Sequence, residues 1–148
     1  MDVGGPFPAT LPALAFENAT RRNRPNLVVG SLVYARCESA PRDAEPLLSC
    51  TDAGGKAAAF GPLTAGLPFA LQTRAARALL ARPPPRALAA LGAALSFELV
   101  VGVNGRCWVH AAAVQDTVLV ANALQQAADM VPEQALALVQ ALLAQRER

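Results

Sequence analysis

Short runs of alternating or β-branched residues dominate the first third of the chain. The run from Leu27 to Cys37 is rich in β-branched and aromatic residues, and its second half alternates as a half-buried strand does. A second short strand is predicted over 46–51 and a third over 9–16, where Pro12 interrupts the pattern. Polar residues 18–26 and the proline-bounded segment 41–46 are predicted loops. This part therefore reads as β structure.

The pattern changes after residues 61–66, whose glycines and proline are typical of a linker. A possible strand over 68–71 precedes an alanine- and leucine-rich helix over 73–81, which the prolines at 83–85 end. A second helix is predicted from Arg86 to about Leu95. The last part is also helical. Its first helix, over 115–130, repeats apolar residues at Val118, Ala121, Leu124 and Ala128, and Pro132 opens a final helix with a stripe of Leu136, Val139 and Leu142 or Leu143.

The clearest local signal is a β-hairpin. Strand-like runs over 97–101 and 106–110 flank Gly102-Val103-Asn104-Gly105. The Asn-Gly pair predicts a type I′ turn, which needs positive φ at both residues. Trp108, the single tryptophan, is expected on the same strand face as Arg106 and His110.

Composition refines this architecture. The 148 residues are 53% hydrophobic, but 33 of them are alanine, whose small side chain buries little apolar surface. We therefore predict a core with few large side chains and a protein that is stabilised by partner proteins. We therefore predict an α+β protein of two parts, divided at about 1–62 and 63–148. No apolar run is long enough to span a membrane and no signal peptide opens the chain, so a soluble intracellular protein is expected. Three cysteines without a C-x-x-C pair predict buried reduced thiols rather than disulfides or zinc.

The basic residues are unevenly placed. Twelve of the thirteen are arginine, and Arg21, Arg22 and Arg24 lie in the polar loop with Asn26. Arginine forks onto phosphates, so this loop is predicted to contact the backbone of a nucleic acid, with Lys56 as a further candidate; a solvated charge run or a salt-bridged protein interface is the alternative. Between 70 and 110 only Glu98 opposes five arginines: Arg74, Arg77, Arg82, Arg86 and Arg106. Arg106 is a further candidate for nucleic-acid binding, whereas Arg74 and Arg77 are predicted to form a solvated helix face.

Catalytic chemistry is poorly represented. His110 is the only histidine, and a strand histidine is usually a surface or interface residue. Asp43 and Glu45 lie in a proline-bounded turn, where solvated charge is the common outcome. No acidic cluster has metal-ligand spacing. We therefore predict no catalytic residue, metal or cofactor. A hydrolytic enzyme that cuts RNA is kept as the least favoured of the functional hypotheses.

The glycine-rich turn partly resembles the G-x-x-G loop with which KH domains clamp a nucleic-acid backbone. In those domains the loop joins two helices and offers backbone N–H groups to phosphates, whereas here it joins two strands. The alternative is a hairpin turn in which Gly102 is a bulge or close-packing site. Trp108 could likewise stack on a base, although a lone tryptophan is more often the anchor of a core or domain interface.

Three segments together resemble one family. They are the run 23–36, the segment Asp43-Ala44-Glu45-Pro46, and the stretch from Gly102 to Val109. In order and spacing they are similar to the ribosomal RNA-processing protein 40 family, cap subunits of the eukaryotic RNA exosome. The likeness runs from Asp2 to the last helix and implies an S1-type OB-fold domain followed by a KH domain. Members carry the first strands of the S1 barrel before this start, so the chain is expected to be a fragment, a shortened gene model or a reduced homologue.

The resemblance also implies a function. It predicts a non-catalytic, RNA-binding cap subunit that stabilises a ring of RNase PH-like subunits, meets other cap subunits, and guides RNA to the channel for 3′–5′ processing and degradation. The G-x-N-G motif falls on Gly102, Asn104 and Gly105, and with Trp108 is expected to serve structure at a domain interface. Nucleus, nucleolus and cytoplasm are the expected locations, with no membrane partner. The alternatives are a purely structural ring-clamping module or a non-functional fragment.

Overall fold

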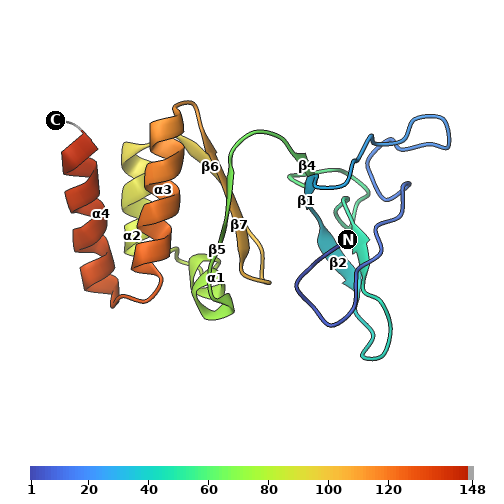
Figure 1. Ribbon diagram of the computed structural model, residues 1–148, viewed down its shortest axis with the longest axis horizontal. Coiled ribbons are helices and arrows are strands. Elements are labelled where there is room, and N and C mark those ends of the chain that lie inside the picture. The colour runs from blue at the N-terminus through green and yellow to red at the C-terminus, as the bar shows by residue number, and fades with distance from the viewer. Residues whose placement is uncertain (147–148) are drawn as a thin grey trace. The chain divides into compact units, whose positions relative to one another are not determined.

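The chain forms two compact units, Met1–Thr64 and Ala65–Arg148. The structure is a computed structural model and describes residues 1–146. The sequence-based division lies two residues earlier, inside β4 (Gly61–Leu63), whose pairing belongs to the N-terminal unit. The predicted α+β fold class is confirmed, with strands in both units and helices only in the second (Figure 1).

The N-terminal unit consists of two small antiparallel sheets. In one sheet β1 (Leu32–Tyr34) pairs with β4; in the other β2 (Arg36–Ser39) pairs with β3 (Leu47–Ser49). The predicted strand over 46–51 is thus confirmed as β3. The candidate over 9–16 forms only isolated bridges, from Thr10 to Leu47 and from Phe16 to Cys50. Pro12 prevents a longer ladder because it lacks an N–H donor.

The strand predicted from Leu27 onward is wrong in its first half. Residues 28–31 form a turn, in which the Ser31 amide donates to the Val28 carbonyl at 3.0 Å and the Val28 amide donates to the Ser31 hydroxyl at 3.1 Å. Gly30 has φ +95°, a value open to glycine, and Val29 is fully exposed. The β-branched composition suggested a strand, but Gly30 makes the chain turn before β1 begins.

Few large side chains are buried in the N-terminal unit. Among the described residues, its buried apolar positions are Ala9, Leu48 and Cys50. Tyr34 and Phe60 pack their rings 4.9 Å apart beside this small core. The thin core expected from the alanine content is therefore found in this unit.

The C-terminal unit is built around a three-stranded antiparallel sheet of order β5-β7-β6. The strands are β5 (Leu67–Ala70), β6 (Phe97–Val101) and β7 (Arg106–Ala111). The predicted hairpin is confirmed, with β6 and β7 in register from the pair Phe97 and Ala111 to the pair Val101 and Cys107. β7 is the central strand, so its alternate side chains face the two sides of the sheet.

Four helices complete this unit, close to the predicted ranges: α1 (Thr73–Leu79), α2 (Arg86–Ala94), α3 (Val114–Ala127) and α4 (Pro132–Arg146). The triple proline separates α1 from α2, and Pro132 opens α4 because its missing N–H costs nothing in the first turn. The apolar stripe predicted for α3 is shifted. Val118 is exposed, and the buried positions are Thr117, Val120, Ala121, Ala123 and Leu124.

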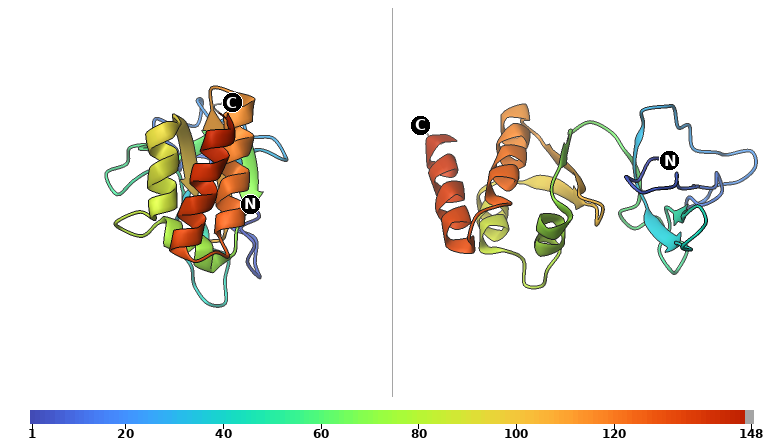
Figure 2. Two further views of the ribbon diagram at one scale, coloured as in Figure 1. Left: turned by 90° about the vertical axis from the view of Figure 1, so that its left-hand side faces the viewer. Right: turned by 60° about the horizontal axis from the view of Figure 1, so that its bottom comes forward.

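The helices of the C-terminal unit lie on one face of its sheet. Figures 1 and 2 show α2 and α3 next to the sheet and α4 packed on the outer side of both. Leu91, Val109, Val120 and Val139 are fully buried where these layers meet. The opposite face of β7 carries Trp108 and its neighbours at alternate positions.

The three cysteines differ in access to reagents. Cys37 is exposed, whereas Cys50 and Cys107 are buried and burial raises the pKa of both thiols. Because the thiolate is the reactive form, we expect iodoacetamide at pH 8 to label Cys37 alone in the native protein. All three should react in denaturant. Intact-mass spectrometry measures this directly, and rapid native labelling of Cys50 or Cys107 would contradict the packing.

Candidate nucleic-acid interface

A closed turn presents the first arginines of the N-terminal unit. The Thr20 amide donates to the Asn23 carbonyl at 2.9 Å, and the Asn23 amide donates to the Thr20 hydroxyl at 3.0 Å. Arg21 and Arg22 are therefore held at the tip of this turn, and Arg24 follows it directly. All three are exposed, and none forms an ion pair with another described residue. Their guanidinium groups are available to an external anion.

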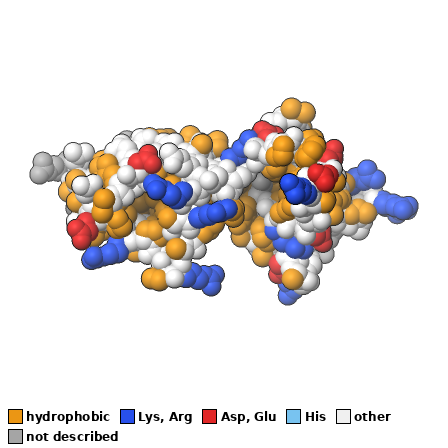
Figure 3. All heavy atoms as spheres, turned by 90° about the horizontal axis from the view of Figure 1, so that it is seen from below, with side chains coloured by type: hydrophobic (Ala, Val, Ile, Leu, Met, Phe, Trp, Pro, Cys, Tyr) orange, Lys and Arg blue, Asp and Glu red, His pale blue; other side chains and the backbone are white. Residues whose placement is uncertain are grey.

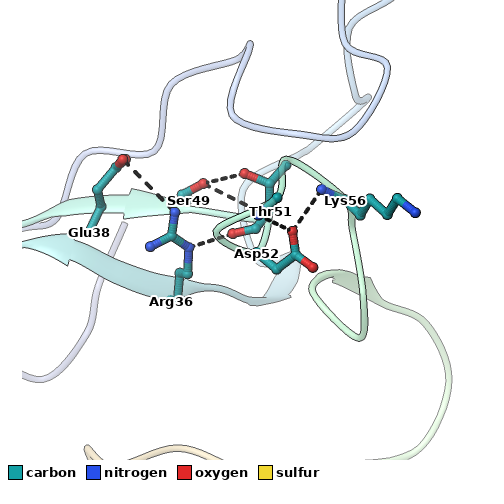
Figure 4. Close-up of polar contacts among 7 residues, drawn as sticks. Arg36, Glu38, Ser49, Thr51, Asp52 and Lys56 are labelled. Atoms are coloured by element: carbon teal, nitrogen blue, oxygen red, sulfur yellow. Dashed lines mark hydrogen bonds and ion pairs between the residues drawn. The ribbon is translucent and has the colours of Figure 1, made fainter.

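Lys56 lies on a second, well-ordered turn. One carboxylate oxygen of Asp52 accepts the amides of Gly54 at 2.8 Å and Lys56 at 2.9 Å, and the Asp52 amide donates to the Lys56 carbonyl at 2.7 Å. Figure 4 shows the Lys56 side chain pointing away from Asp52, so the contact between them is made by the backbone. The turn therefore fixes the backbone position of Lys56 and leaves its ammonium group in solvent.

A hydrogen bond joins the bases of these two loops. The Ala57 amide, next to Lys56, donates to the Glu17 carboxylate at 2.8 Å, and Glu17 directly precedes the polar loop. Residues 40 apart in sequence thus meet. Asn26 is exposed in the same loop as the arginines. The N-terminal unit therefore contains five of the predicted RNA-binding residues: Arg21, Arg22, Arg24, Asn26 and Lys56. We call this set the basic loop cluster.

Arg36 has a structural role that the sequence pattern did not reveal. Its Nε donates to the Thr51 carbonyl at 2.5 Å, and its guanidinium lies 3.9 Å from the Glu38 carboxylate (Figure 4). The Ser49 and Thr51 hydroxyls are 2.9 Å apart at the same place. Arg36 therefore ties β2 to the end of β3 instead of offering its charge to a ligand.

The G-x-N-G segment forms a tight hairpin turn, but not of the predicted type. The Gly105 amide donates to the Gly102 carbonyl at 3.0 Å and the Gly102 amide to the Arg106 carbonyl at 2.9 Å. Gly105 has φ +85°, whereas Asn104 does not have positive φ, so the type I′ prediction is wrong. The four-residue turn instead places glycine alone in the left-handed region, the arrangement of a hairpin with a glycine bulge.

This turn lies against the start of α1. The Leu71 amide donates to the Gly105 carbonyl at 2.8 Å, and a side chain on Gly105 would collide with the Leu71 carbonyl. A side chain on Gly102 would likewise meet the Arg106 carbonyl at 2.8 Å. The amides of Gly102, Gly105 and Arg106 already have partners within the protein, the last being the Asn104 side chain at 3.2 Å. A phosphate would have to displace these bonds, which disfavours a backbone clamp here.

Trp108 is buried, with 5% of its surface exposed. Its Nε1 donates to the Ala65 carbonyl at 2.8 Å, and its ring stacks on His110 at 5.9 Å between centroids. A side chain on Gly66 would lie 2.6 Å from the indole, so the backbone packs closely against it. This arrangement is that of a packing anchor, with the indole face covered rather than open to a base. Arg106, on the same strand, is exposed and belongs to the C-terminal unit.

No group of three or more His, Cys, Asp or Glu side chains among residues 1–146 could hold a metal ion. Within the same range, no helix has both the length and the apolar character needed to cross a bilayer.

Two family models match this chain. Residues 1–61 match the family described as Exosome complex component RRP40, S1 domain, and residues 69–115 match the KH domain family. The chain carries an RRP40-type S1 domain followed by a KH domain. The resemblance to the ribosomal RNA-processing protein 40 family drawn from the three sequence segments is thereby confirmed.

Individual RRP40 proteins support the same assignment. The chain is 44% identical to Exosome complex component RRP40 of Mus musculus over 135 residues, covering 90% of this chain and 49% of that protein. It is 44% identical to Exosome complex component rrp40 of Schizosaccharomyces pombe, covering 90% and 56%. The human protein is 41% identical over 135 residues. The chain thus spans about half the length of the RRP40 proteins it matches.

A solved structure agrees in fold. An exosome complex RNA-binding protein superposes with a TM-score of 0.69, covering 93% of this chain and 81% of that one at 15% identity. The KH family match over residues 69–115 contains α1, α2, β6 and β7. In this KH domain the segment that joins two adjacent helices is Leu80–Pro85, which contains three prolines and no glycine. A glycine-rich phosphate loop of the KH type is therefore absent from that position.

Proposed function

We propose that this chain acts as a non-catalytic, RNA-binding subunit of the RNA exosome cap, in which it helps to stabilise the ring of RNase PH-like subunits and guides RNA towards the channel. The similarity to RRP40 proteins over both domains supports the assignment to this complex. The observation that carries RNA binding is the basic loop cluster, whose three arginines are exposed and have no ion-pair partner among the described residues. Such groups contact phosphates readily.

The proposal includes partners, location and the lack of catalysis. Other cap subunits, ring subunits and RNA are the proposed partners, and the nucleus, nucleolus and cytoplasm are the proposed locations. The absence of enzymatic activity is tested by incubating the purified chain with end-labelled single-stranded RNA. We expect the RNA to keep its length, since His110 stacks on Trp108 and no group of three or more metal-ligating side chains occurs among the described residues; shortening of the RNA would show a ribonuclease instead.

Removal of the loop arginines provides the main test. In the triple variant Arg21→Gln, Arg22→Gln, Arg24→Gln, we expect at least about a tenfold loss of affinity for single-stranded RNA at low salt. The slope of log K against log salt should fall by about 2, since each lost phosphate contact removes about 0.7 on a single strand. Fluorescence anisotropy of a labelled RNA measures both quantities.

A charge-matched control separates the effect of an arginine's position from the effect of losing one positive charge. Arg22→Gln and Arg42→Gln each remove one exposed arginine from the same unit, but Arg42 lies in the proline-bounded turn outside the basic loop cluster. We expect Arg22→Gln to weaken RNA binding more strongly than Arg42→Gln. Equal effects would show that only net charge matters, and unchanged binding in the triple variant would remove the loop from the RNA interface.

One observation favours a ring-clamping module with little RNA contact. Val28 and Val29, which lie two and three residues after Asn26, are 67% and 106% exposed. Exposed apolar side chains beside arginines are common at protein interfaces. If the triple arginine variant still assembles with ring subunits while RNA binding by the wild-type chain is undetectable, this second function is preferred.

A further inference from the structure

A threonine closes the turn that presents the arginines of the basic loop cluster. Thr20 is exposed, and its hydroxyl oxygen accepts the Asn23 amide at 3.0 Å. Among the described residues, no acceptor takes the proton of this hydroxyl group. The turn therefore holds the oxygen at the surface and leaves its O–H bond open to an external reagent.

Thr20 is the hydroxyl residue nearest to the three loop arginines, Arg21, Arg22 and Arg24. It directly precedes Arg21 and Arg22, and no other serine or threonine occurs in the segment 17–30. Successive Cα atoms lie about 3.8 Å apart, so long side chains that start one and two residues away reach a group attached to Thr20. A negative charge on this oxygen would lie beside the arginines.

The loop supplies no counter-ion of its own to these arginines. Residues 18–37 contain no aspartate or glutamate, and Glu17, at the base of the loop, accepts the Ala57 amide. Figure 3 shows Lys or Arg side chains that project from the end of the N-terminal unit at which this loop lies in Figure 1. A phosphate group on Thr20 would therefore be the anion closest to them in sequence.

The segment around Thr20 is open to a modifying enzyme. It contains no helix or strand from residue 17 to residue 31, and every residue from 20 to 24 is exposed. Loops of this kind open locally at a low cost in free energy and are the part of a fold that other enzymes reach most easily. A kinase can therefore bind this segment while the rest of the unit stays folded.

We propose that Thr20 is a phosphorylation site and that its phosphate releases RNA from the basic loop cluster by pairing with the loop arginines. The proposal rests on the RNA binding proposed above and adds a regulation of that surface. A Ser/Thr kinase would transfer the γ-phosphoryl group of ATP. The bond from phosphorus to the Thr20 oxygen forms, the bond from phosphorus to the β,γ-bridging oxygen breaks, ADP leaves, and the hydroxyl proton passes to a base of the kinase.

Charge explains why the phosphate would compete with RNA. A phosphothreonine carries a charge of about −1.5 to −2 at pH 7 and has three acceptor oxygens, so it neutralises about two guanidinium groups. Its distance from the arginines is limited by the chain, which gives it a high effective concentration. Each RNA phosphate carries one charge and comes from solution. The intramolecular pairing is therefore favoured.

The binding test uses the full chain with phosphothreonine incorporated at position 20 during expression. The matched control carries phosphoserine at position 31, because Ser31 is exposed after the same loop but has no arginine within four residues. Anisotropy is measured with labelled oligo(U) over a series of salt concentrations. We expect the phosphate at Thr20 to weaken binding at least about tenfold and to lower the salt slope by about 1.4, at about 0.7 for each lost contact. The phosphate at Ser31 should weaken binding less than about threefold, since salt screens distant charges.

A second comparison tests the pairing with the arginines. The same phosphate at Thr20 is placed in the triple variant Arg21→Gln, Arg22→Gln, Arg24→Gln. We expect little further loss of affinity, because the groups that the phosphate would neutralise are gone and the two changes are therefore not additive. If the phosphate weakens the triple variant by the same factor as the wild type, it acts by general repulsion of RNA and the proposed pairing is wrong.

Recognition of Thr20 by kinases is tested separately. The full chain and its Thr20→Ala variant are incubated with Mg-ATP and a panel of purified Ser/Thr kinases that select basic substrates, and mass spectrometry locates the phosphate. We expect one phosphoryl group in the loop of the wild type and none in the loop of the variant. If no kinase of the panel modifies Thr20, the site is refuted.

The results distinguish this proposal from the proposed function. If the wild-type chain binds oligo(U), the triple variant binds it weakly and the chain phosphorylated at Thr20 binds it as the wild type does, the regulation does not exist and the proposed function stands. If the wild-type chain does not bind oligo(U), the RNA binding of the proposed function fails, and the regulation fails with it.

Discussion

Replacing Gly105 with alanine should lower the free energy of unfolding of the C-terminal unit by about 2 to 4 kcal/mol. Gly105 has φ +85°, a backbone conformation that costs an L-residue about 1 to 2 kcal/mol. The added Cβ would also collide with the Leu71 carbonyl and disturb the bond from the Leu71 amide to the Gly105 carbonyl. Urea unfolding followed by Trp108 fluorescence measures the change, because the single tryptophan lies in this unit.

Gly92→Ala is the matched control for this prediction. Gly92 lies inside α2, and a Cβ at this position would meet no atom within 4 Å. Alanine in a helix interior is favoured over glycine by about 0.5 to 1 kcal/mol, so this variant should be more stable than the wild type. Opposite signs for the two glycines are expected. A neutral or stabilising effect of Gly105→Ala would mean that the hairpin turn has room the structure does not show.

The C-terminal unit was more predictable than the N-terminal unit for a physical reason. Its helices end at prolines and its hairpin is marked by the segment from Gly102 to Gly105, so local sequence sets the element boundaries. In the N-terminal unit the strands have three or four residues, and a single glycine decides whether β-branched residues form a strand or a turn. Val28 and Val29 have strand propensity, yet Gly30 turns the chain before pairing begins.

The turn type and the buried stripe of α3 were not predicted because local hydrogen bonds of the Asn104 and Thr117 side chains decide them. Asn-Gly favours positive φ at both residues, but the Asn104 side chain accepts the Arg106 amide and fixes a different turn. In α3, the Thr117 hydroxyl accepts the Ala111 amide at 3.0 Å and donates to the Ala113 carbonyl. This buries a polar residue and moves Val118 to the surface.

The candidate RNA-binding residues, too, could be predicted from the sequence only in part. The closely spaced arginines of the basic loop cluster are visible in the sequence, but the hydrogen bond from the Ala57 amide to Glu17, which joins the bases of the two loops, is not. Arg74 and Arg77 are predicted to form a solvated helix face, and the structure leaves both exposed on α1.

Trp108→Ala should have the largest effect on stability, with a loss of about 3 to 5 kcal/mol. The side chain is 5% exposed on the central strand, and its removal leaves a cavity beside Gly66 and an unpaired Ala65 carbonyl. The free energy of unfolding of a whole domain is only about 5 to 15 kcal/mol. We therefore expect this unit to be partly unfolded at 37 °C in the variant. Alkylation measures this unfolding, because the buried Cys107 thiol should become reactive. Cys50 lies in the other unit, so a Cys50 thiol that stays protected shows that only the C-terminal unit unfolds.

Trp108→Phe distinguishes the ring from its hydrogen bond. Phenylalanine retains an aromatic ring between the strands but cannot donate to the Ala65 carbonyl, so the expected loss is about 1 to 2 kcal/mol. Thermal denaturation by circular dichroism compares the two variants, since neither contains tryptophan. If Trp108→Ala were as stable as Trp108→Phe, the indole would not anchor this face of the sheet, and a surface role such as base stacking would return as the better explanation.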